Sequence, residues 1–245
     1  MMKFLSAILS VVFLFTFTLL LIIFHPFQWL SFNLFGVKGH AKVINALNFC
    51  LVKTLLLIGV TVRVINKHKI PENTSIIFVS NHQSISDIPP IGWFFRKYNP
   101  KFVSKIELGK GIPSVSYNLK KGGAALIDRN DSKQSIRELV DFSKRINKNK
   151  WGAVIFPEGT RSRDGVPKRF AHSGLKIITK YNNDGYVVPL TINNSWKIFR
   201  YGKFPLGLGS PITITTHKPI KINSLPYEEL LEKTETIIKE HIKQK

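Results

Sequence analysis

Two short polar segments could carry chemistry, and each directly follows a run of β-forming residues. The first, Asn81-His82-Gln83-Ser84-Ile85-Ser86-Asp87, places a carboxylate five residues after a histidine. A carboxylate that accepts the proton of one ring nitrogen fixes the tautomer and leaves the other nitrogen free as a general base. Residues five apart point about 140° from each other on an α-helix. The two side chains can therefore meet only if His82 lies in a loop before the helix.

The prolines that follow indicate such a loop, because Pro89 and Pro90 suit the first turn of a helix and place Asp87 near its cap. A plain capping aspartate beside an incidental loop histidine is the alternative interpretation of the same spacing.

The second segment reads Phe156-Pro157-Glu158-Gly159-Thr160-Arg161-Ser162-Arg163. Glycine lets backbone amides approach a ligand closely, and the planar guanidinium of Arg161 matches the oxygens of a phosphate. We expect an anion site next to a carboxylate here. An ordinary surface turn with exposed charges is the alternative.

An α/β domain must position these segments. β-rich runs predict about seven strands, at residues 60–65, 75–80, 102–104, 123–128, 152–156, 186–192 and 211–217. Helical patterns alternate with them. One begins at a cap on Asp131 or Ser132 with an apolar face of Ile136, Leu139, Val140 and Ile146, and the others cover Ser173–Asn182 and Tyr227–Gln244. Strands alternating with helices predict a largely buried sheet with helices packed on it.

The amino-terminal segment matches a lipid bilayer in length. From Phe4 to Phe24 no residue is charged, and as a helix this stretch would reach roughly 31 Å. A cleaved signal peptide is the alternative, but no small-residue cleavage site precedes His25-Pro26, so we expect a retained anchor. Residues 41–60 are less uniformly apolar and could either span or lie in the interface, with Phe27 and Trp29 between the two helices.

The net charge limits the classes of partner that the chain could bind. The chain carries 36 Lys and Arg against 15 Asp and Glu, a net charge of +21, while 44% of it is hydrophobic, which excludes a disordered polyelectrolyte. This positive charge would attract nucleic acid, an anionic lipid surface or anionic small substrates. The apolar segment favours the membrane. If its helix spans the bilayer, the basic excess after it predicts that the rest of the chain lies in the cytoplasm. We therefore expect a membrane-associated helical anchor at residues 1–59 and a catalytic domain at 60–245.

Further blocks accompany the two polar segments, in the order Lys105-Ile106-Glu107-Leu108 with Pro113, Gly122-Gly123 through Ile127-Asp128 to Arg129, and Val188-Pro189-Leu190. Together these blocks resemble the glycerolipid acyltransferase family, and within it the 1-acyl-sn-glycerol-3-phosphate acyltransferases. The resemblance covers roughly residues 60–217. It implies a glycerol-phosphate-acyltransferase-like α/β fold and a membrane-bound O-acyltransferase of phospholipid biosynthesis.

The resemblance also implies a reaction. His82 would remove the proton of the sn-2 hydroxyl of lysophosphatidic acid, and Asp87 would orient the histidine. The hydroxyl would attack the thioester of acyl-CoA or acyl carrier protein directly and give phosphatidic acid. No acyl-enzyme, metal or cofactor beyond the acyl donor is expected, and Cys50 needs no role as a nucleophile.

For acceptor binding, the resemblance implies the block Glu158, Gly159, Thr160 and Arg161, with Lys105 and Arg129 helping to bind the phosphate. A solvated surface lysine is the alternative for Lys105. A salt bridge with Asp128 or Asp131 is the alternative for Arg129.

Other functions remain open at this stage. The same fold and dyad could act on glycerol 3-phosphate or on another lysophospholipid or lyso-aminolipid. A catalytically silent membrane tether would not need the histidine and aspartate, and a nucleic-acid binder would not need a lipid-length helix. The sequence has no G-x-S-x-G elbow and no G-x4-G-K loop, which argues against a common serine hydrolase or a P-loop NTPase.

Overall fold

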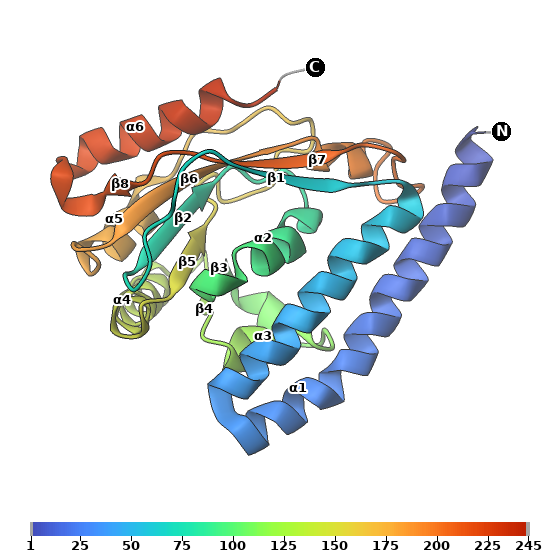
Figure 1. Ribbon diagram of the computed structural model, residues 1–245, viewed down its shortest axis with the longest axis horizontal. Helices are drawn as coiled ribbons and strands as arrows, with labels where there is room; N and C mark the ends of the chain where they lie inside the picture. Colours follow the sequence, from blue (N-terminus) through green and yellow to red (C-terminus); the bar gives the residue numbers. More distant parts are fainter. Residues whose placement is uncertain (1, 244–245) are drawn as a thin grey trace.

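The computed structural model describes residues 2–243, and its centre is one mixed sheet (Figure 1). The strands are β1 (Val62–Asn66), β2 (Ile76–Ser80), β3 (Lys101–Lys105), β4 (Ala125–Ile127), β5 (Gly152–Ile155), β6 (Tyr186–Asn193), β7 (Ile212–Thr216) and β8 (Ile220–Lys221). The order across the sheet is β1-β7-β6-β2-β5-β3-β4, with β8 paired to β6. Strands β6, β2, β5, β3 and β4 are mutually parallel, whereas β7 runs antiparallel to β6.

The seven predicted strands are confirmed, and the two-residue strand β8 was missed because it is too short to show a periodic pattern. The α-helices of the described residues are α1 (Met2–Thr54), α2 (Ile88–Phe94), α3 (Val115–Lys121), α4 (Ser132–Asn149), α5 (His172–Lys180) and α6 (Tyr227–Glu240). The predicted cap of α4 is confirmed, since the Asp131 side chain accepts the N–H of Gln134 at 2.9 Å. Of the predicted terminal helix, α6 ends at Glu240, and Gln244 lies outside the described residues.

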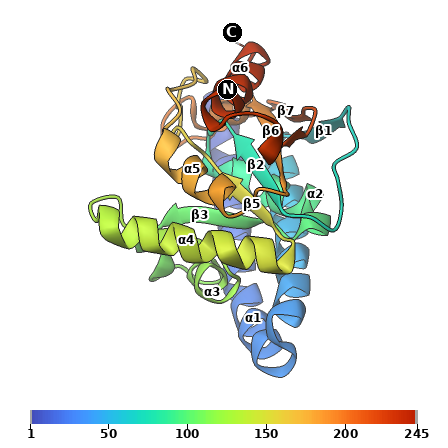
Figure 2. The ribbon, with the colours of Figure 1, turned by 90° about the vertical axis from the view of Figure 1, so that its left-hand side faces the viewer.

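Alternate side chains of the central strand β2 pack against different helices on the two faces of the sheet. Ile77 and Val79 of β2 pack with α4, α5 and α6. Ile76 and Phe78 point the other way and pack with α2 and the amino-terminal helix. Successive strand residues face opposite sides, so a continuous apolar run is buried on both. Figure 2 shows α4 and α5 in front of the sheet in that view and the amino-terminal helices behind it. The apolar face predicted for α4 is confirmed at Leu139 and Ile146, which are buried, but it was wrong at Ile136, which is 51% exposed. The buried stripe includes Phe142, so it turns away from Ile136.

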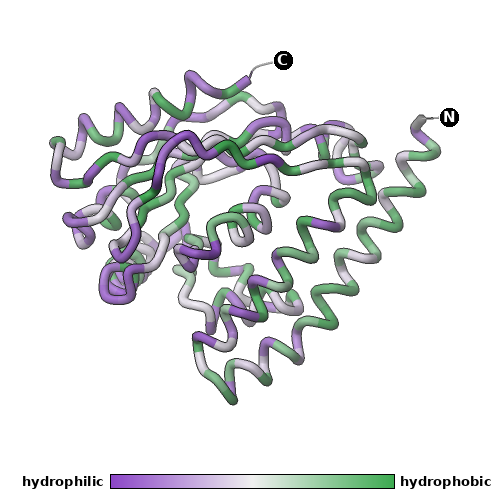
Figure 3. The backbone as a smooth tube through the Cα atoms, in the orientation of Figure 1, coloured by the Kyte–Doolittle hydropathy of each residue, from purple (hydrophilic) through white to green (hydrophobic). Residues whose placement is uncertain are grey.

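Helix α1 is a hairpin of two arms. Gly36 breaks it with φ 60° and ψ −153°, a conformation that glycine adopts without strain. We call residues 2–35 the first arm and residues 37–54 the second arm. The second arm packs along α2 and α3 and leads through a short 3₁₀ turn into β1. Figure 3 shows that apolar residues dominate the first arm throughout its length, and Figure 1 shows the turn of the hairpin beyond the edge of the α/β domain.

The first arm is longer than predicted. We expected the first helix to end before His25-Pro26, with Phe27 and Trp29 between two helices, but the helix continues through Pro26. Proline removes one helical hydrogen bond. Packing against α3 supports this part of the arm, since the rings of His25 and Phe32 lie 5.8 and 6.2 Å from that of Tyr117.

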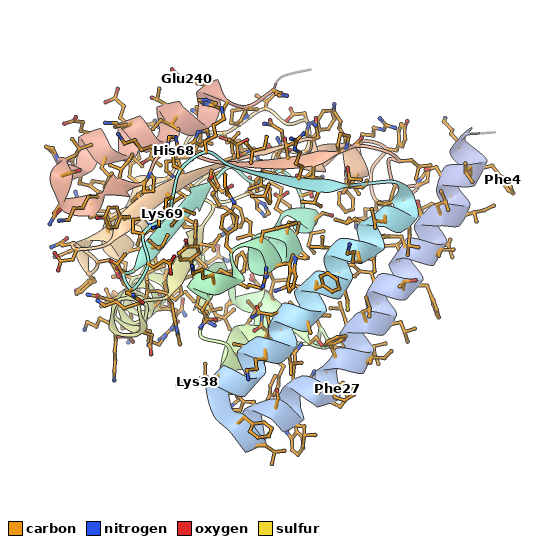
Figure 4. The ribbon with its side chains drawn as sticks, viewed as in Figure 1. Phe4, Phe27, Lys38, His68, Lys69 and Glu240 are labelled. Carbon is orange, nitrogen blue, oxygen red and sulfur yellow. The ribbon has the colours of Figure 1, made fainter. Side chains whose placement is uncertain are left out.

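Among residues 2–243, one helical segment, Lys3–Ile58, is long and apolar enough to cross a membrane, judged by length and composition. Its most apolar part has a mean hydropathy of 2.9, and only 17% of that part is buried, unlike the core helix of a soluble protein. Figure 4 shows Phe4 and Phe27 pointing away from the α/β domain. These observations support the predicted membrane association. The boundary between anchor and catalytic domain and the cytoplasmic orientation stay predictions.

Candidate active site

The predicted site residues all lie at one edge of the sheet. Asn81 to Asp87 follow β2, and Phe156 to Arg161 follow its parallel neighbour β5. Lys105 is the last residue of β3, and Arg129 comes two residues after β4. Because these four strands are adjacent and parallel, their carboxyl ends meet, which is where open α/β sheets bind ligands. We call this side of the sheet the carboxyl edge.

His82 and Asp87 meet as the loop interpretation requires. Nδ1 of His82 lies 2.8 Å from Oδ2 of Asp87, and Asp87 is fully buried. The same oxygen also accepts the N–H groups of Gln83 at 2.8 Å and Ser84 at 2.9 Å. An ionised carboxylate only accepts hydrogen bonds, so Nδ1 carries the proton. The carboxylate therefore fixes both the tautomer and the direction of the imidazole.

The turn between β2 and α2 explains this arrangement. Ser84 caps a single 3₁₀ turn, Ile85–Asp87, by accepting the N–H of Ser86 at 3.1 Å, while Asp87 accepts the N–H of Ser84 in return. This reciprocal capping box turns the aspartate back toward the histidine. Asp87 thus takes part in the cap of the 3₁₀ turn and is also the partner of His82, whereas it makes no side-chain capping hydrogen bond to α2. The alternative of an incidental histidine beside a plain helix cap does not hold.

An aromatic ring also packs on one face of the imidazole. Its ring stacks on that of Phe156 with centroids 4.1 Å apart and an angle of 19° between the planes. The side chain of His82 keeps 17% of its surface exposed. Within the described part of the chain no protein group hydrogen-bonds Nε2. This nitrogen is the atom available to accept a proton from a ligand.

Glu158 connects the two loops of the site. One of its oxygens accepts the backbone N–H of His82 at 2.8 Å, and the other accepts the N–H of Lys168 at 2.9 Å. The side chain is only 8% exposed. Burial raises the pKa of Glu158, and the two backbone hydrogen bonds oppose that shift. In this arrangement the carboxylate positions the loop of His82, and the role of Glu158 in acceptor binding stays a prediction.

The rest of the second segment forms an exposed turn. Gly159 has φ 69°, which a side chain would strain, and Thr160 Oγ1 accepts a hydrogen bond from Lys168 Nζ at 2.7 Å. Arg161 is exposed at the end of this turn.

Lys105, Arg129 and Arg161 are exposed cations at the carboxyl edge, and none of them forms an ion pair within residues 2–243. The salt bridge considered for Arg129 is absent there. The side chains of Asp128 and Asp131 instead accept backbone N–H groups of Asn130 and Gln134. Neighbouring strands lie about 4.8 Å apart, so the strand before Arg129 is roughly 14 Å from the strand before His82. That distance exceeds the reach of an arginine side chain, so Arg129 could contact only the far end of an acceptor bound at His82, and the roles in phosphate binding stay predictions.

Several supporting residues escaped the sequence analysis. Asn81 bonds the backbone of Ile192 in both directions, at 2.8 and 2.7 Å, and Gln83 accepts the N–H of Ser195 at 3.1 Å. These bonds fasten the loop of His82 to β6 and the turn after it. Ser162 donates its N–H to the carbonyl of His82 at 2.8 Å. Polar residues flanking the histidine were visible in the sequence, but their distant partners were not.

Metal ligands do not gather at the site. Among residues 2–243 no three His, Cys, Asp or Glu side chains lie close enough together to hold a metal ion. The expectation of a reaction without metal or cofactor stays a prediction.

Comparisons with known proteins agree with this geometry. The model of a family described as Acyltransferase matches residues 61–193. A 1-acyl-sn-glycerol-3-phosphate acyltransferase of Helicobacter pylori (strain J99) is 35% identical over half of this chain and half of its own length. The corresponding protein of Saccharomyces cerevisiae is 26% identical over 84% of this chain and 66% of its own length. The chain spans about half the length, or less, of the first curated relatives that it matches.

A solved structure extends the similarity to the whole chain. The 1-acyl-sn-glycerophosphate (LPA) acyltransferase PlsC from Thermotoga maritima superposes with a TM-score of 0.82 at 25% identity, covering 99% of this chain and 96% of that one. The fold, hairpin included, is therefore shared. With the family model covering more than half of its residues, the chain belongs to the acyltransferase family.

Proposed function

We propose that this protein transfers a fatty acyl group from a thioester donor, acyl-CoA or acyl carrier protein, to the sn-2 hydroxyl of 1-acyl-glycerol-3-phosphate, giving phosphatidic acid. The hydrogen bond between His82 and Asp87 at the carboxyl edge is the observation that carries the proposal. Membership in the acyltransferase family and the names of the relatives support the substrate class.

In this mechanism Nε2 of His82 accepts the proton of the acceptor hydroxyl as its oxygen attacks the thioester carbonyl. The charge that develops on the imidazole is stabilised by the Asp87 carboxylate, which is already fixed by two backbone N–H groups. The tetrahedral intermediate then collapses, the C–S bond breaks and the thiolate leaves with the proton that His82 holds. No covalent acyl-enzyme forms.

The acceptor's phosphate would lie among Arg161, Lys105 and Arg129. Within residues 2–243 these cations have no carboxylate partner, and they are exposed at the same edge as His82. A charge-assisted hydrogen bond to such an anion contributes about 1.5–3 kcal/mol. Glu158 and Gly159 shape the turn that presents Arg161, while Thr160 either contacts the acceptor or keeps Lys168 in place.

A direct test uses the full-length protein in detergent, with lysophosphatidic acid and acyl-CoA or acyl carrier protein as substrates. Phosphatidic acid should form, and His82→Ala should abolish its formation while the circular dichroism spectrum stays unchanged. The control is His172→Ala, which removes an exposed histidine on α5. Full activity in the His82 variant would disprove the assignment of the base.

The acceptor is tested separately. A panel with one donor should rank 1-acyl-glycerol-3-phosphate above glycerol 3-phosphate and above lysophospholipids or lyso-aminolipids without a phosphomonoester. Lys105, Arg129 and Arg161, which have no ion-pair partner in the part of the chain that the structure describes, favour this order. A higher kcat/KM for an acceptor that lacks the phosphomonoester would favour the alternative function on another lysolipid.

A further inference from the structure

Lys168 is an exposed cation of the loop after β5 that the proposed mechanism does not use. Its Nζ donates a hydrogen bond to Thr160 Oγ1 at 2.7 Å, and it forms no ion pair within residues 2–243. Holding a long, flexible side chain on a neutral hydroxyl costs conformational entropy, and a hydroxyl is a weaker partner for a cation than a carboxylate or phosphate. The fold therefore holds an ammonium group in place without giving it an anion.

The loop that carries this lysine is fastened to its surroundings at several points. Ser162 donates its N–H to the carbonyl of His82 at 2.8 Å. Gly165 packs so closely on the indole of Trp196 that a side chain at this position would clash with it. Phe170, near the end of the loop, is buried in the core that the sheet forms with α4, α5 and α6. The position of the lysine backbone is thus set by the fold.

Glu158 brings the backbone of Lys168 close to the proposed base. Its two carboxylate oxygens accept the N–H groups of His82 at 2.8 Å and of Lys168 at 2.9 Å. Because one carboxylate bridges them, the two backbone nitrogens lie at most roughly 8 Å apart. Arg129, by contrast, follows a strand that is roughly 14 Å from the strand before His82. Lys168 is therefore anchored nearer to His82 than Arg129 is.

The proposed acceptor needs a cation at a short distance from the base. In 1-acyl-glycerol-3-phosphate, a single CH₂–O unit separates the carbon of the sn-2 hydroxyl from the phosphorus. A hydroxyl held at Nε2 of His82 thus brings a phosphomonoester, with about two negative charges at neutral pH, into its immediate surroundings. A lysine ammonium has three N–H groups, and Thr160 accepts only one of them. The other two have no acceptor in the part of the chain that the structure describes.

The charges of the loop agree with an anionic ligand. Residues 159–169 contain four basic residues and one acidic residue, Asp164. The side chain of Asp164 accepts the N–H of Val166 at 3.0 Å and forms no ion pair with a described residue. Nζ of Lys168 rests on the residue that precedes Arg161, so two cations leave the same turn. Their mutual repulsion is relieved when an anion lies between them.

We propose that Lys168 is a further acceptor-binding residue, which binds the phosphomonoester together with Arg161, and that Thr160 positions its ammonium group. The inference rests on the proposed function, because the acceptor supplies the phosphate. Lys168 would contact the phosphate and not the reacting atoms. It would therefore determine the preference for a phosphate-bearing acceptor and leave the chemical step unchanged.

An acceptor analogue that cannot react tests the inference without turnover. The probe is 1-hexanoyl-propanediol 3-phosphate, which lacks the sn-2 hydroxyl, and the reference ligand is the same molecule without its phosphate. Calorimetry on the full-length protein in detergent gives both Kd values. Lys168→Met should weaken binding of the phosphate probe about tenfold and leave the reference ligand unaffected. Arg169→Met removes the neighbouring exposed cation and is the matched control, which should bind both ligands like the unmodified protein.

Equal affinities of Lys168→Met and the unmodified protein for the phosphate probe would overturn the inference alone. Equal affinities of the unmodified protein for the two ligands would overturn the proposed acceptor as well. Lys168→Arg retains the charge and should recover most of the affinity. If it binds the probe as weakly as Lys168→Met, the loss comes from a changed loop structure, and the assignment of the charge is wrong.

Steady-state kinetics with lysophosphatidic acid tests the role of Thr160. Thr160→Val removes the hydroxyl and should raise the KM of the acceptor while kcat stays unchanged. In the double variant Thr160→Val/Lys168→Met the KM should equal that of Lys168→Met, because Thr160 acts through the lysine. Additive increases in KM would mean that Thr160 contacts the acceptor independently and would overturn its positioning role.

Discussion

Glu158 accepts the backbone N–H of His82 at 2.8 Å, although 76 residues separate the two in the chain. The second oxygen of the same carboxylate accepts the N–H of Lys168. One buried side chain thus fixes the loop after β2 relative to the loop after β5, and those loops hold the proposed base and the proposed phosphate site. We therefore assign Glu158 a positioning role in addition to the acceptor binding that the family resemblance implies.

Glu158→Gln tests this role, because an amide offers one oxygen where the carboxylate offers two. One of the two buried N–H groups would face the amide nitrogen and lose its partner. Such a loss costs about 1–3 kcal/mol, so we expect kcat to fall about 10- to 100-fold with a smaller change in the KM of the acceptor. Steady-state kinetics measures both constants. Glu107→Gln, at an exposed glutamate of the same edge, is the control and should keep its activity. A change confined to the acceptor KM would indicate direct binding instead.

Asp87→Asn separates orientation from capping. The amide oxygen can still accept the N–H groups of Gln83 and Ser84, so the turn should survive. The amide cannot stabilise a protonated imidazole or enforce its tautomer, and we expect kcat to fall by about 10²–10⁴-fold. Kinetics combined with the thermal unfolding midpoint distinguishes the two effects. A variant that loses stability but retains its kcat would reduce Asp87 to a cap.

Arg161→Ala should act on the acceptor alone. The loss of one charge-assisted hydrogen bond to a phosphate costs about 1.5–3 kcal/mol, which predicts an increase of about 10- to 100-fold in the KM of the phosphate-bearing acceptor. The KM of the donor should not change. Arg163→Ala removes another exposed arginine of the same loop and is the matched control. Equal effects of Arg161→Ala on both substrates would mean that this arginine does not bind the acceptor's phosphate.

Because of His217, we expect the contact between α6 and the sheet to be sensitive to acid. Burial, with the neighbouring charges of His241, Lys67 and His68, lowers the pKa of His217 to about 4. Its Nε2 lies 2.8 Å from Thr191 Oγ1, and its ring lies 4.4 Å from that of His241. In the unfolded chain a histidine binds a proton near pH 6.5, whereas the folded protein resists protonation down to about pH 4. The contribution of neutral His217 to stability is therefore fully present above pH 6.5 and is lost as the pH falls from 6.5 to about 4.

The loss at His217 amounts to about 3 kcal/mol at most. The thermal midpoint of the unmodified protein should fall more steeply between pH 7 and pH 4.5 than that of His217→Gln, which can retain the hydrogen bond to Thr191. His172→Gln, at an exposed histidine, should follow the unmodified protein. Parallel curves for all three proteins would show that His217 does not contribute.

Deletion of residues 1–59 should leave the α/β domain insoluble as well as detached from membranes. Phe13, Leu55 and Ile58 belong to the same buried cluster as Phe78 and Ile91, so the deletion would expose the core on one face of the sheet. Gel filtration without detergent should show aggregates. A monodisperse, folded truncation would show that the hairpin and the domain are separable units.

Much of the fold was predictable because it rests on local patterns. Alternating β-forming runs gave the strands, and the cap on Asp131 gave the start of α4. Where local signals misled, packing was the reason. The uncharged run from Phe4 to Phe24 set the length expected for the first helix, but the helix continues past it where His25 packs on Tyr117, and the apolar Ile136 lies on the solvent side of α4. A local sequence pattern reflects only residues that are close together in the chain, so it cannot indicate contacts with distant elements.

For the site, the sequence by itself determined the chemistry that is available: a histidine and an aspartate in one loop, and a glycine-containing turn with an arginine in another. Local capping sufficed to bring His82 and Asp87 together, since both ends of that interaction lie within seven residues. Only the tertiary structure decided that Glu158 accepts the backbone N–H of the histidine and that Phe156 stacks on its ring. It also decided that Ser6 of the first arm hydrogen-bonds the carbonyl of Leu206, 200 residues away. The physical reason is the order of the strands. Strands that are neighbours in this sheet are distant in the chain. Their order is fixed by long-range hydrogen bonds and packing, which form only in the folded protein.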